Sequence, residues 1–157
     1  MLNFYKTIRE AAGDVVIIGC NTVSHLSAGL FELERIGDDT SPKKWDAVVK
    51  MGVNCLAFRA FQHNVFYGCD ADCVGHTDEI PWKKNRNWLE LLAISGTPLF
   101  TSIDPRKTTD EIKEDLKKAY ALAEKQEVVA EPENWFDDAF PEKWKVGDKE
   151  YQFDFSR

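Results

Sequence analysis

Short apolar runs and longer amphipathic stretches alternate along this chain. The run Val15-Val16-Ile17-Ile18-Gly19-Cys20 is continuous and apolar, which is typical of a parallel strand buried on both faces. Further segments with the length and residue types of strands lie at 31–35, 53–58 and 98–102. The stretch from 62 to 81 is rich in turn residues and is predicted to be a loop.

Amphipathic stretches between these runs are predicted to be helices. They lie at 4–12, between 42 and 52, at 82–94, and after 108–111. Ser41 is a favourable N-cap for the second of them, with Pro42 at its first position, and Gly52 is expected to end it. The last helix follows the capping box Thr108-Thr109-Asp110-Glu111. Its apolar stripe consists of Ile112, Leu116, Ala119, Tyr120 and Ala123.

Strands that alternate with helices indicate an α/β fold with a parallel sheet of about four strands and helices on its outside. The amino-acid composition changes near residue 128, beyond which Pro and Trp become frequent. A hairpin is expected around Gly147-Asp148-Lys149, as at the start of a separate β domain. We therefore divide the chain into an α/β part, 1–127, and a β part, 128–157.

Charge and composition exclude several classes of partner. The 157 residues carry 20 Lys+Arg and 27 Asp+Glu, a formal net charge of −7, and no basic stripe is visible. Nucleic acid is therefore not an expected partner. The apolar runs are far shorter than the ~20 residues of a membrane span, so no membrane partner is expected either. The 4 cysteines are too few for a disulfide scaffold and leave the redox compartment undecided.

Carboxylates gather where predicted strands end. Asp38 and Asp39 follow the second strand candidate directly, and Asp70 and Asp72 follow the third at a distance. In barrels of alternating strands and helices, the active site is built at this carboxyl-terminal edge. A structural alternative is that the negative charges of Asp38 and Asp39 interact favourably with the dipole of the helix that begins near Ser41.

The order of several short motifs resembles the α-galactosidases (melibiases) of glycoside hydrolase family 36 and the related family 27. Gly19-Cys20-Asn21 is followed by Gly29-Leu30 and then by Arg35-Ile36-Gly37-Asp38-Asp39-Thr40, similar to the family's Arg-x-Gly-x-Asp-Thr. Cys69-Asp70-Ala71-Asp72-Cys73 resembles its Asn-Asp-Pro-Asp segment. The stretch Gly96 to Ser102 resembles its last barrel strand, and the tail resembles the passage into its C-terminal β domain.

The resemblance implies a retaining mechanism with two carboxylates, one a nucleophile and the other a general acid/base. Asp39 stands at the position of the acid/base. Arg35, Cys20 and Asp72 stand at positions that contact or surround the sugar. Carbohydrate, with terminal α-galactosides as the expected class, is thus the implied substrate, and no metal or other cofactor is implied.

Two further aspartates of the motifs are expected to have structural roles. Asp38 is assigned to helix capping and Asp70 to holding its loop. The sequence has Tyr67, Cys69 and Ala71 where the family has Trp, Asn and Pro. These differences bear on which sugar is bound.

The chain is much shorter than a complete (β/α)₈ barrel, which needs roughly 250 residues. Its four strand candidates match the later strands of the family's barrel, so the resemblance implies the C-terminal half of a TIM barrel. The family's nucleophile lies on an earlier strand, outside this sequence. We therefore expect this chain alone to be inactive, and to self-associate through the open apolar edge of 15–20.

The residues also suggest two other classes of function. Cys55, His63, Cys69, Cys73 and His76 include a Cys-x₃-Cys-x₂-His spacing, so a small Cys/His metal-binding α/β protein is an alternative. A phosphate-binding module would use the turn after 15–20. The Gly-x-Gly-x-x-Gly pattern of such turns is missing there.

Overall fold

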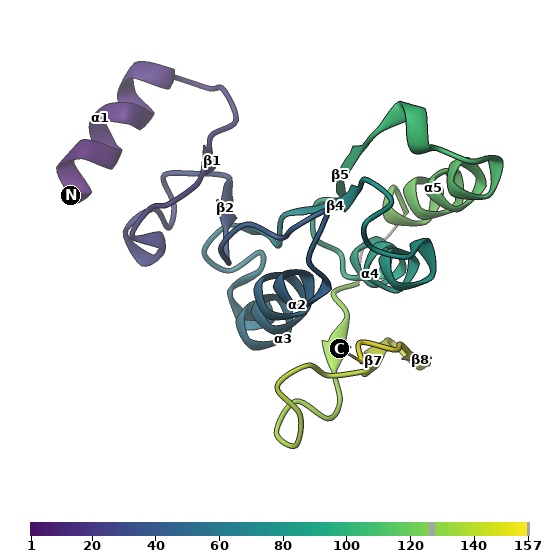
Figure 1. The fold of residues 1–157 in the computed structure, drawn as a ribbon. Helices are drawn as coiled ribbons and strands as arrows, with labels where there is room; N and C mark the ends of the chain where they lie inside the picture. The colour runs from purple at the N-terminus through teal and green to yellow at the C-terminus, as the bar shows by residue number, and fades with distance from the viewer. Residues whose placement is uncertain (126–127, 157) are drawn as a thin grey trace.

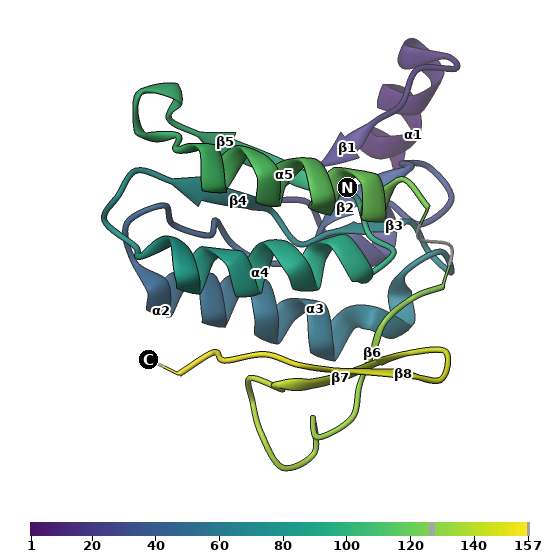
Figure 2. The same ribbon diagram turned by 90° about the vertical axis from the view of Figure 1, so that its right-hand side faces the viewer.

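A computed structural model describes residues 1–125 and 128–156 of the chain. Its strands are β1 (Ile18–Gly19), β2 (Leu33–Arg35), β3 (Gly68–Asp70), β4 (Cys73–His76) and β5 (Phe100–Ile103). β1, β2 and β3 pair in parallel in that order, and β4 pairs in parallel with β5. Only two residues separate β3 from β4, so they are successive stretches of one pass across the molecule (Figure 2). The parallel α/β arrangement expected from the sequence is confirmed.

The helices are α1 (Leu2–Ala12), α2 (Trp45–Ala47), α3 (Asn54–Arg59), α4 (Trp82–Ile94) and α5 (Asp110–Ala123). A π-helical stretch, Val48–Val53, joins α2 to α3, so residues 45–59 form one helix. The α4 helix covers the residues predicted for it. Thr109 caps α5, its Oγ1 accepting a hydrogen bond from Ile112 N over 3.3 Å, one residue later than the predicted cap at Thr108.

The prediction of a strand at 53–58 is wrong, because this segment is helical. Val53, Leu56 and Ala57 are buried, and this i, i+3, i+4 spacing is that of one helix face. The expected helix end at Gly52 is wrong for a related reason. Gly52 lies against Trp88, and a Cβ there would be 2.8 Å from Cζ2 of the indole. The glycine therefore permits close packing inside the helix.

The third pass of the sheet lies instead in the stretch predicted to be a loop. Its strands β3 and β4 carry Asp70 and His76 among buried apolar neighbours, so no continuous apolar run marks them. The helix before them also begins later than predicted. Ser41 Oγ accepts hydrogen bonds from the N–H groups of Lys43 and Lys44, each over 3.1 Å, and α2 starts only at Trp45.

The prediction that the first strand is buried on both faces is wrong. β1 is 2 residues long, and Val15, Val16 and Ile18 are 60%, 66% and 48% exposed. Within the described residues β1 pairs with β2 and leaves its other edge open. Figure 1 shows α1 and β1 at one end of the molecule, away from α4 and α5.

The tail forms a small antiparallel sheet of β6 (Glu131–Pro132), β7 (Lys143–Val146) and β8 (Lys149–Gln152). The expected hairpin is present, with its turn at Gly147-Asp148 between β7 and β8. Trp144, Phe153 and Phe155 are buried and belong to the same apolar core as Trp88 and Leu92. Figure 2 shows this hairpin beneath α3. Among the described helices, none is long and apolar enough to cross a membrane.

Candidate active site

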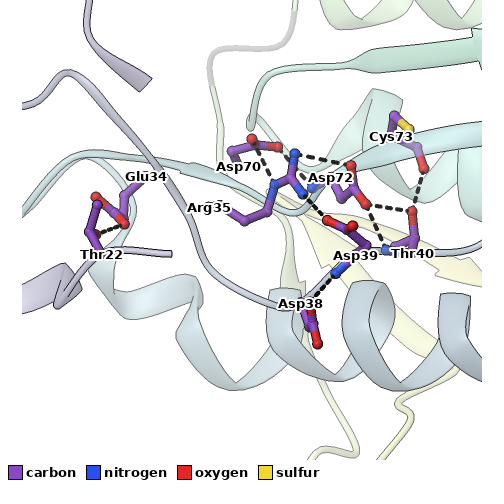
Figure 3. Close-up of polar contacts among 9 residues, drawn as sticks. All are labelled: Thr22, Glu34, Arg35, Asp38, Asp39, Thr40, Asp70, Asp72 and Cys73. Atoms are coloured by element: carbon purple, nitrogen blue, oxygen red, sulfur yellow. Dashed lines mark hydrogen bonds and ion pairs between the residues drawn. The ribbon is translucent and has the colours of Figure 1, made fainter. Parts of the chain in front are cut away.

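The guanidinium of Arg35, at the end of β2, lies among three carboxylates (Figure 3). Its Nε donates to Asp70 Oδ2 over 3.0 Å, and its Nη2 lies 3.1 Å from Asp72 Oδ1. Its Nη1 donates to Asp39 Oδ1 over 3.3 Å. The planar fork of the arginine thus holds acidic side chains from the β3–β4 pass and from the loop that follows β2.

Sheet register accounts for part of this arrangement. Arg35 and Asp70 are direct partners across the β2–β3 pair. Asp72 lies two residues on, in the left-handed region with a φ of 71°, and its N–H donates to Asp70 Oδ1 over 2.8 Å. Asp72 lies outside the strand, and the turn of the chain at this residue brings its carboxylate to Arg35 beside that of Asp70. The left-handed residue also marks where β3 stops pairing with β2 and β4 begins to pair with β5.

Thr40 ties the loop after β2 to this cluster. Its N–H and its hydroxyl lie 2.6 and 2.9 Å from Asp72 Oδ2, and the hydroxyl is also 2.9 Å from the carbonyl oxygen of Cys73. Asp38 does not cap the following helix as expected. Its Oδ1 accepts a hydrogen bond from Asp39 N over 2.8 Å, within the loop.

Exposure separates the carboxylates into two kinds. The side chains of Asp70 and Asp72 are 2% and 10% exposed, whereas that of Asp39 is 85% exposed. Burial lowers the pKa of Arg35, but the hydrogen bond to Asp70 and the charges of Asp70 and Asp72 outweigh it and raise the pKa above its ordinary value. Arg35 is therefore a fixed cation, and Asp39 is the carboxylate of the cluster that solvent reaches.

An open groove of about 320 Å³ runs beside the cluster and includes Arg35 and Asp72 in its lining. Asp70 and Cys73 also line it, together with residues of β1 and β5 such as Ile18, Phe100 and Thr101. Cys20 is exposed and directly follows β1, the strand that pairs with β2. The structure thus brings Asp39 and Asp72 into contact with Arg35, and it places Cys20 at the end of the neighbouring strand.

Sequence reasoning missed two polar residues of this region. The role of Thr40 depends on Asp72, which is 32 positions away, although Thr40 itself belongs to the Arg35–Thr40 motif. Glu34 is buried on β2 and accepts hydrogen bonds from the hydroxyls of Thr22 and Ser27. Figure 3 shows Glu34 with Thr22, apart from the Arg35 cluster. A buried carboxylate in a short strand gives no sequence signal distinct from that of a surface one.

The residues of the metal-binding alternative do not form a cluster. Both ring nitrogens of His63 already have partners, since Nδ1 accepts from Cys69 N and Nε2 lies 2.9 Å from Gly96 O. His76 is buried beside Asn85 and Trp82. Among the residues that the structure describes, no three His, Cys, Asp or Glu side chains are arranged to hold a metal ion.

The fold is of the parallel α/β class, with charged residues gathered where its strands end. No family model matches the sequence, and no curated protein matches it. Among solved structures, the chain is similar to TtGalA, the α-galactosidase of Thermus thermophilus, in complex with p-nitrophenyl α-D-galactopyranoside. The TM-score is 0.60 and the identity 21%, over 96% of this chain and 32% of that one. The chain thus spans about a third of that enzyme and has a distantly α-galactosidase-like fold.

Proposed function

We propose that this chain is part of a retaining glycoside hydrolase that acts on terminal α-galactosides. Residues 1–127 correspond to the C-terminal half of its (β/α)₈ barrel, and 128–157 to the start of a C-terminal β domain. Parallel strands in chain order support this assignment, with α-helices in the connections from β2 to β3 and from β4 to β5. So does the similarity to an α-galactosidase over nearly the whole chain.

The observation that carries the proposal is the exposed carboxyl group of Asp39 beside Arg35. In the first step, a nucleophilic carboxylate attacks the anomeric carbon, the glycosidic C–O bond breaks, and Asp39 gives its proton to the leaving oxygen. In the second step, Asp39 removes a proton from water, which attacks the same carbon and releases the nucleophile. Asp39 therefore returns to its starting state.

The remaining residues of the site surround the sugar in this proposal. Arg35 holds Asp39 on one side of its guanidinium and borders the groove where a sugar would lie. Asp72 lines the same groove, and Cys20 follows β1, whose Ile18 also lines it. The nucleophile belongs to strands outside this chain.

A hybrid enzyme tests the role of Asp39. In it, this chain replaces the matching third of TtGalA, so that the remaining strands are supplied. Asp39→Asn should lower kcat/KM for an alkyl α-galactoside by roughly 10²–10⁴-fold, because its leaving group needs a proton. The loss should be smaller for p-nitrophenyl α-galactoside in the first step. Azide should accelerate turnover of that substrate by the variant, since azide attack on the intermediate needs no base.

Two controls make the outcome decisive. Asp38→Asn removes the neighbouring exposed negative charge but retains the Oδ1 that accepts the Asp39 N–H, so it should retain activity on both substrates. Equal retention of both activities by Asp39→Asn would rule out the acid/base role. The 157-residue chain alone should not hydrolyse either substrate, and Asp39-dependent turnover by it would show that a nucleophile lies within this chain.

A further inference from the structure

The backbone around Asp39 is anchored, although its carboxyl group is not. Residues 36–44 connect β2 to α2 and contain no helix or strand. Within this connection, Asp39 N donates to Asp38 Oδ1, and the next N–H, that of Thr40, donates to Asp72 Oδ2 over 2.6 Å. The Asp39 side chain is 85% exposed and reaches Arg35 at 3.3 Å.

We propose that Thr40 and Asp72 form a positioning pair that sets the place of the Asp39 carboxyl group for proton transfer. This inference rests on the proposed function of Asp39. It assigns to Asp72 a task carried out through Thr40, in addition to its place beside the sugar.

The bonding of Asp72 supports this task. Both of its oxygens are engaged, Oδ1 with Arg35 Nη2 and Oδ2 with the N–H and hydroxyl of Thr40. One carboxylate therefore fixes Arg35 and the residue after Asp39 together. Asp72 is itself fixed, because its N–H donates to the buried carboxylate of Asp70. A rigid path thus runs from β3 through Asp72 to the peptide that carries Asp39.

Chemistry explains why such a path is needed. A general acid must lie within hydrogen-bond reach of the leaving oxygen, about 2.6–3.2 Å. A displacement of ~1 Å can lower a rate by as much as 10²-fold. The Asp39 side chain makes one long contact with Arg35, so its backbone anchor determines where the carboxyl group lies.

The hybrid enzyme described above provides the test. Thr40→Val removes the hydroxyl at nearly constant size, and Thr40→Ser retains it. We expect Thr40→Val to lower kcat for the alkyl galactoside by about tenfold with KM unchanged, and to affect p-nitrophenyl galactoside less. Thr40→Ser should restore most of the rate. In an Asp39→Asn background, Thr40→Val should have no further effect, because the pair acts through Asp39.

Asp72→Asn gives a second route if Thr40→Val fails to fold, as judged by circular dichroism. It should lower kcat for the alkyl galactoside more than kcat for p-nitrophenyl galactoside. KM is not a criterion for this variant, because Asp72 also lines the groove where the sugar would lie. A raised KM of Thr40→Val, or a loss of rate by Thr40→Val that persists in the Asp39→Asn background, would overturn the positioning role. If Asp39→Asn alone behaves like the unsubstituted hybrid, the proposed function itself fails, so the two failures are distinguishable.

Discussion

Arg35 on β2 and Asp70 on β3 are opposite each other in the parallel register, and Arg35 Nε donates to Asp70 Oδ2 over 3.0 Å. The same two residues therefore join neighbouring strands and form the base of the candidate site. Asp70 also accepts the N–H of Asp72 through its other oxygen. Stability and site geometry consequently depend on one buried carboxylate.

Asp70→Asn should lower the free energy of unfolding by about 1–3 kcal/mol, since it leaves a partly buried cation with a weaker partner. Urea unfolding followed by circular dichroism measures this change. Asp39→Asn is the matched control, because it removes another carboxylate from the same arginine at an exposed position, where the expected loss is below about 1 kcal/mol. Equal losses for the two variants would contradict the expectation that the buried Arg35–Asp70 pair stabilises the fold more than the exposed Arg35–Asp39 pair.

The four thiols should differ widely in reactivity. Burial and then the charge of Asp72 raise the pKa of Cys73 to about 11, and burial, with Asp70 and Glu34, raises that of Cys69 to about 12. Burial also raises the pKa of Cys55, whereas Cys20 is exposed. The thiolate is the reactive form, so at pH 8 a maleimide should label Cys20 first.

Mass spectrometry of the labelled chain should show one fast modification that Cys20→Ser removes. Labelling of Cys69 and Cys73 should stay slow at pH 8, because burial keeps their thiolate fraction low. A fast phase of labelling that remains in Cys20→Ser would contradict the burial described for Cys55, Cys69 and Cys73.

The open edge of β1 should allow two copies of this chain to associate. Val15 and Val16 are mostly exposed, and an unpaired strand edge favours pairing with another chain. Sedimentation velocity should show concentration-dependent association that increases with salt, because salt screens the net charge of −7. Val16→Lys should reduce it. Leu122→Lys, at an exposed apolar position on α5, should leave it unchanged, and equal effects would exclude the β1 edge.

Elements with a clear local pattern could be predicted from the sequence, and elements shaped by distant contacts could not. The run of α4 is complete within its own residues, and so is the stripe of α5 except for Tyr120, which is 44% exposed. Residues 53–58 are apolar enough for either a strand or a helix, and packing against Trp88 through Gly52 accompanies the helix. The β3–β4 pass is polar because its charges are paired with Arg35, a residue 35 positions earlier.

The same distinction holds for the candidate site. Arg35 and Asp39 are four residues apart in the sequence and belong to one motif, so the sequence alone predicts that they lie close together. Spacing could not show that Asp72 contacts both Arg35 and Thr40, since these bonds form only when β2 and β3 pair. Nor could it show that Asp70 and Asp72 differ from Asp39 in exposure.

The small apolar contact between Tyr5 and Phe31 lies outside the main core, with ring centroids 5.3 Å apart. It holds α1 against the β1–β2 end of the molecule together with the bond from Val23 N to the Tyr5 hydroxyl. Segments with few buried contacts open at lower free energy than the core. Amide hydrogens of α1 and β1 should therefore exchange with solvent long before those of α4, as a separate unit of local unfolding.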